Sequence, residues 1–315
     1  MDGIGDELRI WAGNPSYQNE KVRTLPPGSH EMNISETFTD YAGKIVIQLF
    51  KDEELLDESI LTLEPGTPLK ISKATRTPVS EMNPEGMILI PMGFFRFQAE
   101  NTDQFIPYPE LKEPQMNVVN SFFIDKYPIT NAQYLAFITA TGYIPVDQVN
   151  YLKHWVSGKI PEGLENHPVV YVSLDDAKAY ATWAGKRLPT EVEWQYAAGG
   201  AKSLKWPWGN EYDSTLCNHA TGKTTPVDAF PGGKSPFDVM DMTGNVWQLT
   251  NDIYNNGTYY FVIMKGGSFY KPTSSWWYVK GGPQPNNWHQ QLLLVSPSFD
   301  RNATVGFRCV QDVAR

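Results

Sequence analysis

The first 75 residues alternate short apolar segments with turn residues, and this pattern predicts a small all-β domain. Turn signals such as Pro26-Pro27-Gly28 and Pro65-Gly66 separate the apolar segments. Several short strands at such spacing are typical of a β-sandwich, so we expect a small immunoglobulin-like sandwich over residues 1–80. The predicted strands are Glu7–Trp11, Val22–Leu25, Glu31–Ser35, Lys44–Phe50, Ser59–Leu63 and Leu69–Ile71.

Beyond Met87 the apolar positions take up helical spacing in places, and this predicts an α+β domain over residues 86–315. A helix is expected from Thr130 to Gly142, because its apolar side chains fall on one face. After Gly199 turn residues and aromatics dominate, so short strands and long ordered loops are expected. Two further helices should begin at capping boxes, formed by Ser173 with Asp176 and by Thr190 with Glu193.

The composition permits a packed core and excludes some classes of partner. Hydrophobic residues make up 41% of the 315 positions, which fits one large domain or two unequal ones. The net charge of -9 argues against a nucleic acid or an anionic membrane surface as partner. No apolar run reaches the roughly 18 residues that span a bilayer, so membrane insertion is not expected. The compartment stays open: periplasmic or cell-surface if a leader has been removed, and cytoplasmic otherwise.

The second domain contains a series of short motifs rich in glycine, tryptophan and charged residues. In chain order they are Tyr127–Phe137, His167–Ala177, Trp183–Trp194, Trp206–Gly209, Asp241–Trp247, Lys265–Ser268 and Gly306–Cys309. Together they resemble the formylglycine-generating-enzyme family, also called sulfatase-modifying factors, over about residues 86–313. The resemblance implies a variant of the C-type lectin fold with two helices, a small sheet and much irregular structure.

The copper chemistry implied by this resemblance lacks its ligands here. Enzymes of the family bind copper(I), which activates oxygen to oxidise a substrate cysteine, through two cysteines that follow the Gly-Gly-Ser motif. Soft thiolates are the ligands that suit copper(I). Counting from Gly266, the two positions carry Trp276 and Gly281. We therefore expect no copper, no catalytic residue of the family's kind and no formylglycine-generating activity.

The remaining cysteines and two motif arginines fit structural roles. Cys309 matches a family cysteine that forms a disulfide, but the partner position is Ala181, so a buried free thiol is expected. A bond between Cys309 and Cys217 is the less favoured alternative. Arg308 should be a buried structural arginine rather than a substrate clamp. Arg187 and Glu193 could pair inside the fold.

The resemblance also implies calcium, which the family binds at the turn from Gly244 to Gln248. Asn245, Val246 and Gln248 would supply oxygen atoms here. The family has Glu where this chain has the neutral Gln248, and calcium affinity depends on ligand charge. Asn218 matches a ligand of a second calcium site, but the acidic segment that completes that site is shortened. Calcium is thus a candidate cofactor at the first site and a weaker one at the second.

The segment from Pro272 to Arg301 departs most from the family and is the candidate working surface. Aromatic faces beside amides and charges suit a polar organic ligand, a glycan or a peptide. The alternative is that these aromatics pack the loops against the core. The candidate contact residues are Trp276, Trp277, Asn287, Trp288, His289 and Arg301.

Three functions remain in competition, and the third, by analogy only, is a component associated with polysaccharide hydrolysis. The first is a ligand-binding or accessory module built on a family fold that has lost its catalytic cysteines. The second is a metal-dependent oxidoreductase of the same superfamily with an altered active site. Scattered histidines, among them His154, His167 and His289, could hold iron or zinc, although histidines are more often hydrogen-bonded structural groups.

Overall fold

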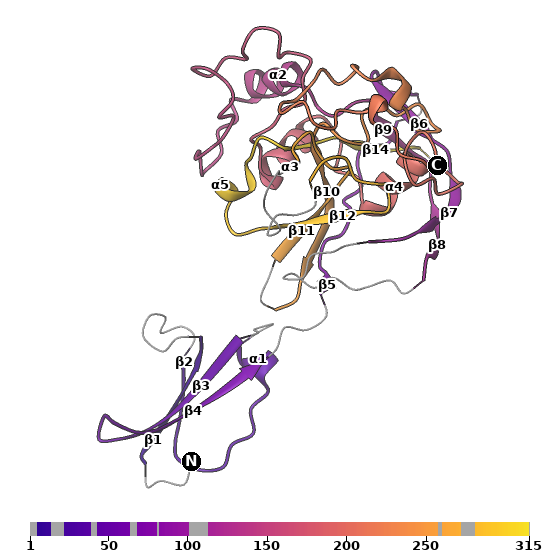
Figure 1. Ribbon diagram of the computed structural model, residues 1–315. Coiled ribbons are helices and arrows are strands. Elements are labelled where there is room, and N and C mark those ends of the chain that lie inside the picture. Colours follow the sequence, from indigo (N-terminus) through magenta and orange to yellow (C-terminus); the bar gives the residue numbers. More distant parts are fainter. Residues whose placement is uncertain are drawn as a thin grey trace. The chain divides into compact units, whose positions relative to one another are not determined.

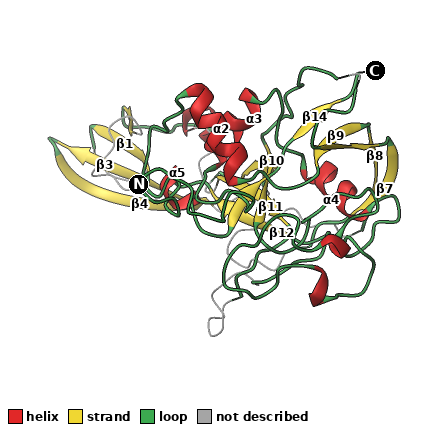
Figure 2. Ribbon diagram, turned by 90° about the horizontal axis from the view of Figure 1, so that it is seen from above, coloured by secondary structure: helices red, strands yellow, loops and turns green. Residues whose placement is uncertain are grey.

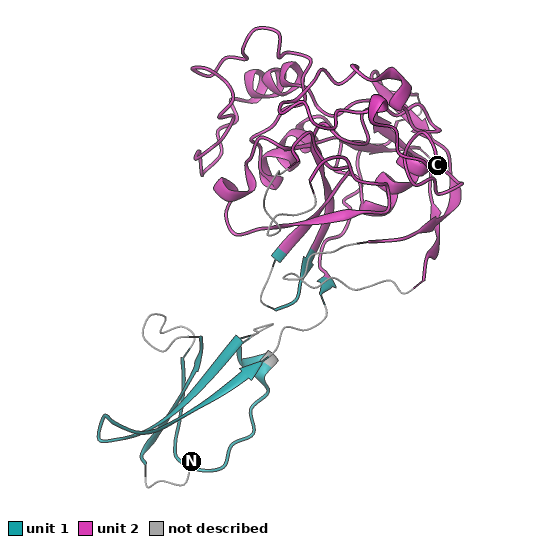
Figure 3. Cartoon of the chain, in the orientation of Figure 1, with its two compact units in different colours: residues 1–69, 254–260 teal, residues 70–253, 261–315 magenta. Residues whose placement is uncertain are grey.

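The protein forms two compact units that are joined by more than one chain segment. The computed structural model describes residues 5–13, 22–38, 43–63, 68–80, 82–100, 113–257, 260–271 and 281–314. One unit comprises Met1–Leu69 with Tyr254–Tyr260, and the larger comprises Lys70–Ile253 with Phe261–Arg315 (Figure 3). The boundary lies before the predicted one at residue 80, because residues 70–80 hydrogen-bond to the larger unit.

The smaller unit is built on one antiparallel sheet with strand order β2-β1-β3-β4 (Figure 1). Its elements are β1 (Glu7–Ala12), β2 (Val22–Leu25), α1 (Ile34–Phe38), β3 (Gly43–Lys51) and β4 (Glu54–Leu63). One apolar cluster of this unit combines buried side chains from β1, β3 and α1, namely Ile10, Ala12, Ile45 and Phe38. The described part of the unit therefore has one sheet and a short helix where the sequence predicted a sandwich of two sheets.

The strand predicted over Glu31–Ser35 is wrong, since the chain there turns into α1. The side-chain oxygen of Asn33 accepts from the backbone N–H of Glu36, which is the local bond that starts a helix. The helix brings Phe38 into the apolar cluster of the unit. A β-type apolar pattern cannot be distinguished from one helical turn over so short a segment.

The larger unit has several small sheets linked by long loops, as expected for an α+β fold with much irregular structure. The β12-β11-β10-β13 path is antiparallel between β11 and β12 and parallel between β10 and β13. A second sheet has the order β14-β9-β6, and β7 pairs with β8. The strands are β5 (Leu69–Lys70), β6 (Met87–Ile90), β7 (Gly93–Phe97), β8 (Gln115–Val119), β9 (Phe122–Asp125), β10 (Trp247–Asn255), β11 (Tyr260–Lys265), β12 (His289–Leu293), β13 (Val305–Phe307) and β14 (Val310–Asp312).

The predicted helices are confirmed together with their caps (Figure 2). They are α2 (Asn131–Thr141), α3 (Leu174–Trp183) and α4 (Glu191–Gly199), followed by the short α5 (Pro297–Asp300) and by 3-10 turns at Ser214–Leu216 and Pro231–Gly233. Thr130, Ser173 and Thr190 each form a capping box. Tyr134 of α2 stacks on Tyr180 of α3 with ring centroids 5.8 Å apart. Over the described ranges, no helix has the length and apolar character that a bilayer span requires.

One buried guanidinium holds the loops of the larger unit together. Arg308 is inaccessible to solvent. It donates to the backbone carbonyls of Asp125, Lys126, Met240 and Asp241 and to the side-chain oxygen of Gln248. Burial lowers the pKa of Arg308 to about 10, so the side chain remains charged at neutral pH. The expectation of a buried structural arginine is confirmed, and so is the pairing of Arg187 with Glu193 at 2.7 and 2.8 Å.

We expect Arg308→Lys to lower the free energy of unfolding by about 3 kcal/mol or more. Lysine offers three donors in place of five, so buried carbonyls would lose their partners. Urea denaturation measures the change, and the exposed Arg76→Lys is the matched control. A loss smaller than about 1 kcal/mol for Arg308→Lys would contradict this role.

Candidate functional site

The residues proposed from the sequence as ligand contacts do not share one open surface. Trp276 and Trp277 lie outside the described residues. Trp288 is 5% exposed and packs in the main apolar core. His289 is fully buried, and Arg301 is 3% exposed. The burial of Trp288, His289 and Arg301 opposes the expectation that they line an open groove, whereas a ligand role for the segment stays a prediction.

Arg301 is neutralised inside the fold by Asp176. Its Nε and Nη2 atoms donate to the two carboxylate oxygens of Asp176 at 2.8 and 3.1 Å. Its Nη1 atom donates to the backbone carbonyls of Asp147 and Val149. Asp176 is also the capping-box residue of α3, and because its carboxylate is fully buried, the ion pair with Arg301 offsets the cost of burying both charges. Arg301 thereby fixes the loop at residues 147–149 to this helix.

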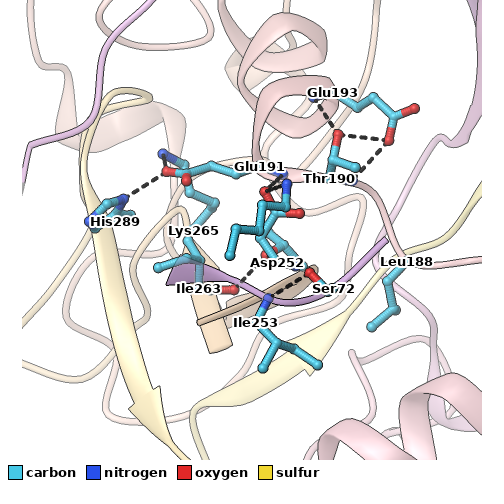
Figure 4. A network of polar contacts seen from close by, with 12 residues as sticks. Ser72, Leu188, Thr190, Glu191, Glu193, Asp252, Ile253, Ile263, Lys265 and His289 are labelled. Atoms are coloured by element: carbon cyan, nitrogen blue, oxygen red, sulfur yellow. Dashed lines mark hydrogen bonds and ion pairs between the residues drawn. The ribbon is translucent and has the colours of Figure 1, made fainter. Parts of the chain in front are cut away.

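His289 belongs to a buried ionic cluster with Glu191 and Lys265 (Figure 4). One carboxylate oxygen of Glu191 lies 2.7 Å from His289 Nδ1 and 3.2 Å from Lys265 Nζ. Burial by itself would raise the pKa of Glu191, but the charges and hydrogen bonds of His289 and Lys265 lower it to about 2. Burial lowers the pKa of Lys265, and Glu191 opposes that change. The cluster links α4, β11 and β12.

A second carboxylate continues this network toward the surface. Asp252 Oδ2 accepts from the backbone N–H of Glu191 at 3.2 Å and lies 2.7 Å from Lys70 Nζ. Burial raises the pKa of Asp252, and Lys70 opposes the change. Beside it, the backbone N–H of Ile253 donates to Ser72 Oγ at 2.9 Å. Sequence analysis missed Glu191 and Lys265, because nothing in the local pattern indicates that residues so far apart in the chain form a pair.

The segment Gly266–Ser268 directly follows β11, which ends at Lys265. Beyond it lies Tyr270, whose backbone carbonyl accepts from the N–H of Gly282 at 2.7 Å. Gly282 and Gln284 then pair with Ser268 and Gly266. The sequence has no cysteine between Gly266 and Gly306. Among the described residues, no group of three or more His, Cys, Asp or Glu side chains is arranged to hold a metal ion.

The two cysteines of the chain are buried and unpaired, as expected for Cys309. Burial raises the pKa of Cys217 to about 12, and it also raises that of Cys309. The backbone N–H of Cys309 donates to Asp125 Oδ2 at 2.8 Å. A thiol acts as a nucleophile or metal ligand through its thiolate, so both groups are inert at neutral pH.

Asn287 lines a polar pocket of about 360 Å³, together with residues of β7, of α4 and of the loop that follows α4. The Nδ2 atom of Asn287 donates to Glu100 Oε1 at 2.7 Å, and the backbone carbonyl of Asn287 accepts from the backbone N–H of Glu100 at 2.8 Å. Gln195, 5% exposed, contributes to the wall, and Arg96 and Lys205 bring positive charge. Within the described structure, Gln195 Oε1 and Asn287 Oδ1 are buried and have no hydrogen-bond partner.

Comparison with known proteins identifies the family. The model of the sulfatase-modifying factor enzyme 1-like domain matches residues 72–313. This chain belongs to that family. A formylglycine-generating enzyme of Thermomonospora curvata is 37% identical over 223 residues, which cover 53% of this chain and 71% of the relative. The formylglycine-generating enzyme of Mus musculus is 32% identical, with 53% of this chain and 58% of the relative covered.

A longer relative and two solved structures also match this chain. The protein called serine/threonine-protein kinase pkn1 of Chlamydia caviae is 30% identical over 81% of this chain, which spans only 43% of that relative. Among solved structures, CarF superposes with a TM-score of 0.52 at 19% identity over 74% of this chain and 100% of CarF. PvdO from Pseudomonas aeruginosa superposes with a TM-score of 0.51 at 21% identity over 79% of this chain and 99% of PvdO. These two likenesses support the fold.

At the turn where this family implies calcium, hydrogen-bond donors meet the candidate ligand oxygens. Asn245 has a positive φ of 58°, and its Oδ1 accepts from the N–H of Thr225 at 3.0 Å and from Asn218 Nδ2 at 3.2 Å. The Oδ1 atom of Asn218 accepts from Thr221 at 2.8 Å. Val246 is fully buried in the same turn.

Gln248 is engaged in the same way. Its Oε1 accepts from Trp194 Nε1 at 2.8 Å and from Arg308 Nε at 2.7 Å, and its Nε2 donates to the carbonyl of Asp241. An oxygen that accepts from two N–H groups, one of them on a charged guanidinium, does not fit a calcium ligand. The residues present therefore fit a turn closed by hydrogen bonds better than a calcium site, and we expect the turn to form without calcium.

We expect Glu191→Gln to destabilise the protein by about 3–5 kcal/mol at neutral pH, because it leaves the buried ammonium group of Lys265 without its carboxylate. The pKa of Glu191 falls from 4.5 to about 2 on folding, so its contribution is complete above about pH 4.5. The contribution disappears as the pH falls through 2. Urea titrations of wild type and variant should therefore converge at low pH, with exposed Glu162→Gln as the control. A penalty that does not change with pH would contradict this assignment.

Chelation of calcium should leave the melting temperature unchanged. A ligand present at a hundred times its Kd stabilises the native state by about 2.7 kcal/mol, which thermal unfolding detects easily. Melting is compared in millimolar calcium and in excess chelator, with magnesium as the control. If calcium but not magnesium stabilises the protein, and the Asn245→Ala variant loses this effect, the expectation is wrong and the turn is a calcium site.

Proposed function

We propose that this member of the sulfatase-modifying-factor family binds a small polar ligand and does not generate formylglycine. The observation that supports the second part is chemical. No cysteine follows the Gly-Gly-Ser motif between Gly266 and Gly306, and the two cysteines of the chain are buried. Without a thiolate pair after this motif, the domain lacks the ligands through which the family holds copper(I) for the oxidation of a substrate cysteine.

The polar pocket at Asn287 supports the ligand-binding part. Buried amide oxygens that lack partners are costly unless a ligand or water donates to them. Glu100, Gln195 and Asn287 offer acceptors on the wall, while Arg96 and Lys205 offer positive charge. A ligand with both N–H donors and a carboxylate, such as a short peptide, matches this set. No aromatic side chain of the described residues lines the pocket, so stacking on sugar rings is less favoured than peptide binding.

The alternative of an altered metal-dependent oxidoreductase has less support. His289 is engaged by Glu191, and His154 contacts Asn131 through its Nε2 atom. His167 contacts Thr224 through Nδ1. These three histidines thus lie in separate hydrogen-bond networks. That arrangement fits structural histidines better than a shared iron or zinc centre.

The protein should leave a sulfatase-type cysteine peptide unchanged in the presence of copper(I) and oxygen. Mass spectrometry of the peptide follows the loss of the thiol, and a formylglycine-generating enzyme assayed in parallel is the positive control. Conversion at a rate comparable with that control would refute the proposed lack of activity.

Gln195→Leu should abolish binding at the polar pocket, because the substitution removes a buried acceptor at nearly constant size. Saturation-transfer NMR with a library of short unmodified peptides, and in parallel with neutral oligosaccharides, measures binding. The exposed Gln148→Leu is the matched control. Peptide signals that persist in Gln195→Leu, or binding of oligosaccharides alone, would contradict the proposal.

A further inference from the structure

Residues 72–78 form a strap that is fixed to the larger unit at both ends. At one end Ser72 Oγ accepts from the N–H of Ile253 at 2.9 Å. At the other end the N–H of Thr77 donates to Asp312 Oδ2 at 3.0 Å, and Thr77 Oγ1 accepts from the N–H of Asp312 at 2.8 Å. A pocket of about 450 Å³ lies between this strap and the segment from Lys178 to Leu188. Because both ends are anchored, the pocket is preformed.

The charged residues that line the strap pocket are all basic: Lys73, Arg76, Lys178, Lys186 and Arg187. This is unexpected in a chain with 35 acidic and 26 basic residues. Lys186 and Arg187 pair with carboxylates that are not part of the lining. Lys73, Arg76 and Lys178 form no ion pair with any described residue, so their charges are available to a ligand.

The unsatisfied polar atoms at the strap pocket are donors. Arg187 Nε and Asn251 Nδ2 are both buried, and neither has a hydrogen-bond acceptor in the described structure. Both residues line the pocket. The pocket thus combines positive charge with donors that lack an acceptor.

We propose that the strap pocket binds an oxyanion, a phosphate or sulfate group. Such a group carries negative charge and several strong acceptor oxygens, and arginine and lysine are the side chains that bind it best. The volume exceeds that of the bare ion, so part of a larger molecule that bears the group also fits. This site is separate from the polar pocket at Asn287 and does not depend on the function proposed for that pocket.

Binding is measured with three probes at constant ionic strength, using chloride as the reference salt: inorganic phosphate, inorganic sulfate and a sulfated oligosaccharide. Isothermal titration calorimetry of the full chain should detect at least one of them. Binding of the inorganic ions identifies a free oxyanion as sufficient, and binding of the oligosaccharide alone identifies a sulfated polymer as the source. Failure of all three probes to bind more strongly than chloride overturns the proposal.

Two variants place the binding at the strap. The double variant Arg76→Gln/Lys178→Gln should raise the Kd about tenfold or more, because it removes two charged donors to the oxyanion. The double variant Lys153→Gln/Lys159→Gln removes the same charge from exposed positions outside the pocket and should leave the Kd nearly unchanged. Asn251→Asp, similar in size but negative, should abolish binding. Equal losses in the two double variants would show general charge attraction and overturn the site, as would a Kd unchanged in Asn251→Asp.

Discussion

The larger unit depends on the hydrogen bonds of one buried guanidinium. Loops that are neither helix nor strand leave backbone carbonyls unpaired, and burying such groups is costly. Arg308 satisfies carbonyls at the end of β9 and in the loop before β10. Through Gln248, which also accepts from Trp194, it reaches α4. A fold with so little regular structure can therefore have a fixed core, and the turn where the family implies calcium is part of the same network.

Beside this network lies the strand on which the family places its chemistry. The backbone N–H of Gln284 donates to the carbonyl of Gly266, and the sequence has no cysteine between Gly266 and Gly306. On the adjoining elements Glu191, Lys265 and His289 form a buried cluster. Such a cluster is more effective at fixing the relative positions of helix and strand than at moving protons to a substrate, because it is fully buried. The available polar groups lie instead in the pocket at Asn287 and in the strap pocket. Our proposal that this chain binds a ligand rather than oxidising one is based on these two pockets.

The sequence predicted best those features that depend on a few neighbouring residues. Capping boxes at Ser173 and Thr190 join residues three positions apart, so the local pattern contained all the information. The apolar pattern predicted an α+β domain, and the family resemblance agreed with it. Arg301 was misjudged as a surface contact because its partner, Asp176, lies 125 residues away. The ionic partners of Glu191 were likewise invisible, and α1 was read as a strand because its apolar pattern fits both structures.

The central claim is that the family fold persists here without a copper centre. Equilibrium dialysis against copper(I), in the presence of a competing chelator, tests it most directly when a formylglycine-generating enzyme is dialysed alongside. We predict that the enzyme retains copper and that this chain retains none above the level of a denatured sample. Retention of one equivalent by the native chain, with an X-ray absorption spectrum that shows sulfur ligands, would contradict the account.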